Sequence, residues 1–205
     1  YITKNPLTSH LDTIRKFSTV RLEKAQSLPD SQTVTVGGII VGARSFVPQS
    51  KQDTGEKMAM FHLDDLTDKV KVLLFTQYYK KYGELAETDK IVFVKGQVIS
   101  DKDDFFIKAE EIIPIDQAQE YFTSMVFIKL IATGLEEETL VGLREILLRY
   151  QGQCPVFVEM QAANHTRIVM KSKKYSILPS RPFRKDIEQL IGKGHLVLYA
   201  NGFEK

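Results

Sequence analysis

The spacing of apolar residues changes at residue 33 from a helical period to a period of two, and this change restricts the folds open to the chain. From there to residue 116 the pattern predicts three strands, one helix and then two strands. The strands are expected over residues 34–41, 57–65, 69–75, 91–99 and 105–113, with the helix over 77–86. A single helix between the third and fourth of five strands is typical of the OB-fold, a five-stranded Greek-key barrel. A β-barrel of another topology would give similar strands, so the position of the helix decides for the OB-fold.

The flanking segments predict an arm before the barrel and a second domain after it. Leu11, Ile14 and Phe17 form an apolar stripe along a short helix, and residues 27–31 (SLPDS) end it. After Pro114 the pattern alternates between strands and helices. Strands are expected over 125–132, 155–162, 166–171, 175–178 and 195–200, and helices over 136–150 and 181–191. The predicted fold class is therefore mixed β and α/β, with a five-stranded OB-fold β-barrel followed by a small α+β domain.

Charge is distributed unevenly along the chain. The barrel region, residues 33–116, holds 11 Lys/Arg and 14 Asp/Glu, a balance of −3. Residues 117–205, the second domain, hold 12 Lys/Arg and 9 Asp/Glu, a balance of +3, while residues 1–32 form the helical arm and linker. Neither domain has the strong positive field of a protein that binds duplex DNA through phosphate contacts alone. Any contact with nucleic acid is therefore expected to depend on a local face.

The composition also limits the cellular setting. No stretch of 18 apolar residues occurs, which argues against a membrane partner. Residue 1 is Tyr, and the opening YITKNPL matches neither a signal peptide nor a transit peptide, so we expect a piece of a longer chain. Cys154 is the one cysteine, which excludes an internal disulfide and fits a reducing cytoplasm.

The sequence offers no catalytic constellation and no cofactor site. Asp64 and Asp65 are adjacent on a strand and point to opposite faces, so they cannot bind one metal ion together. They are expected to mark the end of a strand and its turn. Residues 101–104 (DKDD) lack the glycine and the closing glutamate of a calcium loop. The four histidines are too far apart in the sequence for a zinc motif, and no glycine-rich phosphate loop is present.

Several short motifs in the barrel region follow one another in an order that is more specific than any of them alone. They are VTVGGII at 34–40, TGEKMA at 54–59, LDDLT at 63–67 and VLLF at 72–75. In this order they resemble the OB domain of the bacterial DNA polymerase III alpha subunit, a C-family replicative polymerase. The segments YITKNPL at 1–7, GQCPV at 152–156 and LIGKG at 190–194 are similar to the same family, so the resemblance covers nearly the whole chain.

The resemblance implies a non-catalytic, C-terminal part of a replicative polymerase. In that family the catalytic aspartates and their magnesium ions lie in the palm domain, and no matching stretch occurs in this sequence. The resemblance further implies three partners: single-stranded DNA, the clamp loader's tau subunit and the rest of the polymerase holoenzyme. The expected location is the bacterial cytoplasm, at the nucleoid. A free-standing paralogue, or another protein with an OB module such as an aminoacyl-tRNA synthetase anticodon domain, stays open.

OB-folds bind single strands across strands 2 and 3, next to the loops that join strands 1–2 and 4–5. Strand alternation places Met60, His62 and Lys71 on the outer surface there. With Arg44 at the end of strand 1 and two lysines around the first loop, the predicted binding residues are Arg44, Lys51, Lys57, Met60, His62 and Lys71. We expect His62 to stack on a base and Lys71 and Arg44 to contact phosphates. The acidic loop 101–104 would repel phosphate, so binding is expected to be weak and sensitive to salt.

A basic run without acidic residues lies between residues 167 and 185. The candidate residues for protein docking, which in the family is docking of tau, are Lys171, Lys173, Lys174, Arg181 and Arg184. An exposed edge strand protected by lysines would carry similar residues. Two alternatives to DNA binding also stay open: an ordinary solvated strand with Lys and His on its outer side, and a protein-interaction module whose OB-fold does not bind DNA. The balance of −3 in the barrel region favours the second of these.

Overall fold

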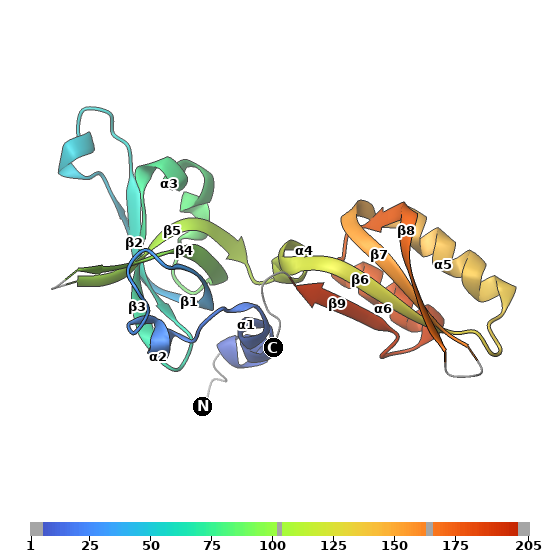
Figure 1. Cartoon of the computed structure of the whole chain (residues 1–205). Helices are drawn as coiled ribbons and strands as arrows, with labels where there is room; N and C mark the ends of the chain where they lie inside the picture. Colours follow the sequence, from blue (N-terminus) through green and yellow to red (C-terminus); the bar gives the residue numbers. More distant parts are fainter. Residues whose placement is uncertain (1–5, 102–103, 163–165, 201–205) are drawn as a thin grey trace, which may run out of the picture. The chain divides into compact units, whose positions relative to one another are not determined.

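The computed structural model describes residues 6–101, 104–162 and 166–200. The chain divides into two compact units, Tyr1–Ala118 and Gln119–Lys205. Figure 1 shows a β-barrel in the first unit and an open sheet with helices in the second. None of the helices in the described ranges is long and apolar enough to cross a membrane.

Five strands close into a barrel in the first unit, in the order β1-β2-β3-β5-β4. The strands are β1 (Thr33–Phe46), β2 (Met58–Asp64), β3 (Lys69–Leu74), β4 (Ile91–Asp101) and β5 (Asp104–Pro114). The helix α3 (Thr76–Tyr82), continued by the 3-10 turn η3 (Gly83–Leu85), connects β3 to β4 (Figure 1). A parallel pair between β3 and β5 closes the barrel, and the other strand pairs are antiparallel. This arrangement is the OB-fold that the order of elements predicts.

Alternate residues of each strand fill the barrel interior. Phe61 and Leu63 on β2, Val72 on β3 and Ile107 on β5 have no exposed surface. Because side chains alternate between the two faces of a strand, their neighbours in the sequence lie on the outside of the barrel. The outer surface of β2 and β3 is therefore set by the same period that builds the core.

The N-terminal arm packs onto the barrel as part of the same unit. It consists of the 3-10 helix η1 (Pro6–His10) and the α-helices α1 (Leu11–Phe17) and α2 (Leu22–Ala25). Leu22 and Ala25 belong to the barrel core, and the ring of Phe17 meets the ring of Phe93 edge-on, with 6.1 Å between centroids. The apolar stripe predicts α1, whereas the four-residue helix α2 is too short for a periodic signal.

Strand β1 continues five residues beyond the predicted segment because a bulge carries it through a glycine. Its register against β2 shifts between Val41 and Arg44, and Gly42 in the bulge has a φ of 64°. Glycine adopts this left-handed conformation without the steric cost that a Cβ adds. After the bulge the strand pairs again, with Arg44 opposite Met60. The bulge therefore brings Arg44 beside the outer surface of β2.

A four-stranded sheet with the order β8-β7-β6-β9 forms the second unit. After α4 (Ala118–Phe122), its elements are β6 (Thr123–Ile131), α5 (Glu137–Arg149), β7 (Gln151–Gln161), β8 (Arg167–Ile177), α6 (Arg181–Ile191) and β9 (Leu196–Ala200). Strands β6 and β7 are parallel, and the β6–β9 and β7–β8 pairs are antiparallel. Leu143 and Ile146 of α5 and Phe183 and Ile187 of α6 pack on the sheet in one apolar core. The two units together confirm the predicted fold class.

One long strand, β8, replaces the two short strands that the sequence predicts over 166–171 and 175–178. The chain between them does not turn away, because the β7–β8 register shifts there and the strand continues past the irregularity. The backbone N–H of Tyr175 donates to Ser172 Oγ at 2.8 Å inside this segment. A local side-chain bond of this kind satisfies a donor that the ladder leaves free, which periodicity does not reveal. Residues 163–165, between the strands predicted over 155–162 and 166–171, lie outside the described residues.

Cys154 is buried near the start of β7. Its side chain is only 9% exposed, and it belongs to the apolar core of the second unit. Burial raises the pKa of the thiol to about 11, because the thiolate is poorly solvated there. The thiol is therefore protonated at neutral pH and behaves as a small apolar side chain.

Candidate nucleic-acid interface

The outer surface of β1, β2 and β3 brings four of the predicted binding residues together. Arg44 lies opposite Met60, and His62 lies opposite Lys71, in the two strand ladders. Arg44 Nη2 is 3.6 Å from Met60 Sδ. His62 and Arg44 are exposed, while Met60 and Lys71 are half-buried. These four residues therefore form one continuous surface on the barrel.

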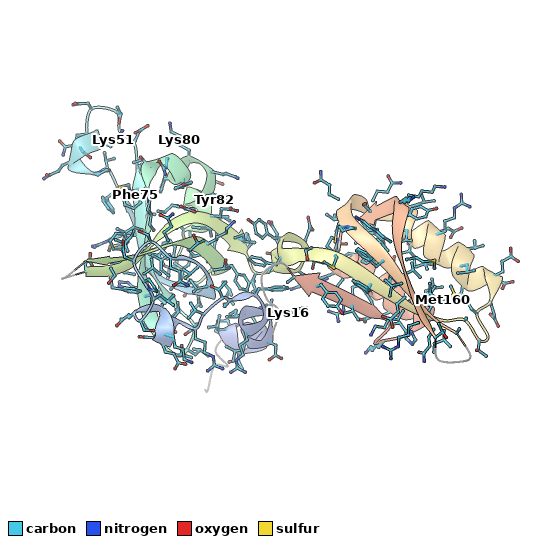
Figure 2. All side chains as sticks on the ribbon, viewed as in Figure 1. Lys16, Lys51, Phe75, Lys80, Tyr82 and Met160 are labelled. Atoms are coloured by element: carbon cyan, nitrogen blue, oxygen red, sulfur yellow. The ribbon has the colours of Figure 1, made fainter. Side chains whose placement is uncertain are left out.

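Strand β5 extends this surface with residues that the sequence does not single out. In the parallel β3–β5 pair, Lys108 lies beside Leu73, which itself lies opposite Met60. Lys108 Nζ is 5.7 Å from the ring centroid of Phe75, a residue labelled in Figure 2. Lys71 Nζ is similarly 5.5 Å from the ring centroid of Phe106. We call the set Arg44, Met60, His62, Lys71, Leu73, Phe75, Phe106 and Lys108 the barrel face.

Cations next to aromatic rings are the combination that single-stranded nucleic acid needs. Aromatic and imidazole rings stack on bases, and Lys and Arg contact the backbone phosphates. Phe75, Phe106 and Lys108 are missed by sequence reasoning because β3 and β5 are about 35 residues apart and their pairing is parallel. A helix and a further strand separate them, so neither period nor turn chemistry indicates that they meet.

Lys71 is already paired in the barrel face. Its Nζ lies 2.5 Å from Asp104 Oδ1 and 2.6 Å from Oδ2, at the start of β5. The Asp104 side chain is 51% exposed and that of Lys71 27% exposed, so solvent screens the pair and its net contribution is about 0–1 kcal/mol. A phosphate would therefore compete with Asp104 for Lys71. Asp104, the last residue of the acidic segment 101–104, therefore opposes the predicted phosphate contact by occupying the Lys71 ammonium.

Lys51 and Lys57 lie on the loop between β1 and β2 and not on the strands. Lys51 ends the short 3-10 helix η2 (Gln49–Lys51), and its Nζ is 3.1 Å from Glu56. Lys80 of α3, labelled with Lys51 in Figure 2, lies 3.5 Å from the same carboxylate, so Glu56 bridges the loop and the helix. The hydrogen bond from Lys51 holds the pKa of Glu56 below its usual value. Lys51 is therefore one of the two lysines that pair with Glu56 in this bridge.

A cleft of about 1010 Å³ lies between the β1–β2 loop and α3. Its lining includes Arg44 and Lys57 on one side and Tyr79, Lys80 and Lys81 on the other. Arg44 belongs to both the cleft and the barrel face, so the two surfaces are continuous. Lys57 is thus connected to the predicted binding surface through the cleft.

The predicted docking residues of the second unit lie on two elements. Lys171, Lys173 and Lys174 are exposed on β8, which is an edge strand of the sheet. Arg181 and Arg184 are exposed in the first turn of α6, where Arg184 Nε pairs with Glu188 at 2.8 Å. Ser180 Oγ caps this helix by accepting from the N–H of Phe183.

The adjacent carboxylates of Asp64 and Asp65 accept hydrogen bonds from backbone groups of the turn after β2. Asp64 Oδ1 accepts from the N–H of Leu66, and Asp64 Oδ2 lies 3.3 Å from Lys69 Nζ. Asp65 is buried and accepts from backbone donors of the turn and the arm. Within the described ranges, no three His, Cys, Asp or Glu side chains are grouped closely enough to hold a metal ion.

Comparison with known proteins gives two consistent results. Residues 34–115 match the OB-fold nucleic acid binding domain of the tRNA_anti-codon family. DNA polymerase III subunit alpha of Vibrio cholerae is 26% identical over 204 residues, which are 98% of this chain and 17% of the relative. The same subunit of Escherichia coli K12 is 29% identical over 97% of this chain, and that of Pseudomonas aeruginosa is 25% identical over 97%. The chain is a homologue of the bacterial DNA polymerase III alpha subunit.

The homology to the alpha subunit confirms the resemblance that the short motifs indicate. It extends through both units, whereas the match to the OB-fold domain covers the barrel alone. An anticodon-binding module would account for the barrel and leave the second unit unexplained. The chain spans 16–17% of the length of these alpha subunits.

Proposed function

We propose that the chain is the non-catalytic C-terminal part of a bacterial replicative DNA polymerase alpha subunit. Its barrel binds single-stranded template DNA, and its second unit docks to the clamp loader's tau subunit. The magnesium ions of the polymerase reaction belong to the palm domain of the parent protein. The remaining partner is the rest of the holoenzyme, in the bacterial cytoplasm at the nucleoid.

The observation that carries DNA binding is the composition of the barrel face. Arg44 and Lys108 stand at its two ends, separated by Met60 and Leu73 on neighbouring strands. The apolar side chains between two cations offer bases a surface on which to rest, while the cations reach the backbone. The barrel face includes the outer surface of β2 and β3, where OB-folds in general bind single strands, and this supports the proposal.

The proposal for the second unit rests on the homology and on the exposed cations of β8 and α6. The basic run from residue 167 to 185 contains no acidic residue, so its field attracts an acidic partner surface. Alanine substitution of Lys173 and Arg181 is a direct check, with tau retention measured on an affinity column.

A second candidate function is a protein-interaction module whose barrel does not bind DNA. The specific observation in its favour is the Lys71–Asp104 pair, which neutralises one cation of the barrel face. The negative balance of residues 33–116 acts in the same direction. DNA binding by the barrel therefore distinguishes the two candidates.

Arg44→Ala combined with Lys108→Ala is expected to weaken binding of a fluorescent oligo-dT about tenfold at low salt. Two lost phosphate contacts also reduce the slope of log K against log salt concentration by about 1.4, since each contact to a single strand contributes about 0.7. Fluorescence anisotropy titrations at several salt concentrations measure both quantities. Lys95→Ala is the matched control, because Lys95 lies on β4, which does not pair with β2 or β3. An equal loss in the control would contradict the barrel face.

Asp104→Asn is expected to tighten oligo-dT binding about threefold, because it frees Lys71 for a phosphate and removes a negative charge. Lys71→Ala alone is expected to have a smaller effect than the same change in the Asp104→Asn background. The same titrations measure this coupling as a double-mutant cycle. Absence of oligo-dT binding in both Asp104→Asn and the unsubstituted chain would favour the module that does not bind DNA.

A further inference from the structure

One face of the sheet in the second unit is covered by both helices, and the other carries a row of rings. Val126 and Ile128 of β6 and Val156 of β7 lie in the core with α5 and α6. Because side chains alternate along a strand, Phe127 and Phe157 lie on the opposite side. We call the residues Phe127, Lys129, Phe157, Lys171 and Tyr199 the sheet face.

The rings of the sheet face are aligned across the strands. Phe127 and Phe157 are register partners on the parallel strands β6 and β7, and their rings stack with 4.8 Å between centroids and 8° between planes. Tyr199 of β9 meets Phe127 edge-on, with centroids 5.0 Å apart. Lys171 of β8, the register partner of Phe157, places Nζ 5.9 Å from its ring centroid. The rings therefore lie on three adjacent strands, and Lys171 extends the row to the fourth.

Partial exposure makes this row unlike a core cluster. Phe127 and Phe157 are half-buried, and Tyr199 is 48% exposed. Four-stranded sheets that carry aromatic residues on their central strands can stack two or three bases on them. Here β6 and β7 are the central strands, and each contributes one phenylalanine.

The charges around the rings are mostly positive. Lys129 and Lys171 lie on the sheet face, and Arg167 stands near its edge on β8. Glu159, the register partner of Lys129, brings one negative charge, and its Oε1 lies 3.8 Å from Arg167 Nε. Further along the strand, Lys173 and Lys174 are exposed. This charge is complementary to a phosphate backbone.

We propose that the sheet face binds single-stranded nucleic acid, independently of the barrel. One base stacks on the ring of Phe157 and displaces Lys171, whose Nζ then contacts the adjacent phosphate. An exposed cation–π contact is weaker than a stacked base, so the exchange favours the bound state. Duplex DNA presents no free base faces, and an acidic peptide would contact the cations but not the rings. Single-stranded nucleic acid contacts the rings with its bases and the cations with its phosphates.

The test uses the full chain with the changes Arg44→Ala and Lys108→Ala, so that the barrel face is weakened. In this background, Phe157→Leu is expected to reduce oligo-dT affinity about tenfold, because leucine keeps the apolar volume but has no π face. Phe157→Trp is expected to restore it. Lys171→Ala is expected to lower the salt slope by about 0.7, and Lys185→Ala of α6 serves as its matched control.

Photocrosslinking locates the contact. Oligo-dT that carries one 5-iodouracil is irradiated with the unsubstituted chain, and crosslinked peptides are identified by mass spectrometry. Crosslinks to Phe157, Phe127 or Tyr199 support the proposal. Crosslinks confined to residues 33–116, with no difference between Phe157→Leu and Phe157→Trp, overturn it and leave binding by the barrel intact.

Two further outcomes separate the sheet face from the barrel and from protein docking. If barrel binding alone fails, Arg44→Ala with Lys108→Ala leaves affinity unchanged while Phe157→Leu still lowers it. Poly-glutamate is added as a competitor at the same concentration of negative charge as the oligonucleotide. If it displaces the oligonucleotide, and no crosslinks to the rings are found, the proposal is overturned in favour of an acidic protein partner.

Discussion

Replacing Asp65 with alanine is expected to lower the free energy of unfolding of the barrel unit by about 3 kcal/mol. Asp65 Oδ2 accepts from the N–H of Leu22 at 3.0 Å, which ties α2 of the arm to the turn after β2. Its Oδ1 accepts from the N–H groups of Thr67 and Asp68 at 2.9 and 3.2 Å. The residue is 8% exposed, so alanine leaves these donors without a partner in a site that water barely reaches.

Chemical denaturation followed by circular dichroism measures this loss. The chain contains no tryptophan, which makes the far-UV signal preferable to intrinsic fluorescence. Hydrogen exchange of residues 19–28 is expected to accelerate more than exchange in β3, because the arm detaches first. Asp64→Ala is the matched control: its partners, the N–H of Leu66 and the Lys69 ammonium, belong to exposed residues that water can reach, so we expect a loss of about 1 kcal/mol or less. Equal losses in the two variants would contradict the anchoring role of Asp65.

Gly96→Ala is expected to destabilise the barrel unit by about 3 kcal/mol or more. A Cβ at residue 96 would lie 2.1 Å from the carbonyl oxygen of Lys108 and 3.0 Å from the Cα of Ala109. Both contacts are with the backbone of β5, so relief requires the neighbouring strand to move. The β4–β5 register shifts at this point, which allows the two backbones to approach so closely.

Thermal and urea denaturation measure the cost of Gly96→Ala, and oligo-dT titration measures its functional effect. Lys108 belongs to the barrel face, so displacement of β5 is expected to weaken DNA binding also at temperatures where the variant is folded. Gly142→Ala in α5 is the control, since its Cβ would meet only the flexible end of Leu190, at 3.1 Å, and alanine favours a helix. A Gly96→Ala variant as stable as Gly142→Ala would show that the strands separate freely.

Asp65→Ala and Gly96→Ala both change the barrel face indirectly, through residues that do not belong to it. Asp65 fixes the turn that joins β2 to β3, and Gly96 lets β4 approach β5. The strands that carry Met60, Lys71 and Lys108 are therefore positioned by contacts outside the barrel face: the turn at the ends of β2 and β3, and the pairing of β4 with β5. Stability and DNA binding are expected to decline together in these two variants. In Arg44→Ala, DNA binding is expected to decline while stability is kept.

The sequence alone determined most elements of this protein, because each depends on neighbours in the chain; the short helix α2 and the continuity of β8 are exceptions. The period of two and the single helix predict the closed barrel, and the helix over 181–191 agrees with α6 residue for residue. Ser180 and Gly192, at the ends of that helix, are local signals of its start and end. The motif order likewise indicated the alpha-subunit homology, since aligned motifs need no tertiary contact.

Only the tertiary structure decided which of these residues meet. Lys71 pairs with Asp104, 33 positions away, and Asp65 with Leu22, 43 positions away. The stacked Phe127 and Phe157 depend on the register of two parallel strands joined by a helix. Period and turn chemistry specify the face on which a side chain lies, but register and closure specify its partner. Those are settled by packing of the whole core, where strands distant in sequence are brought into contact.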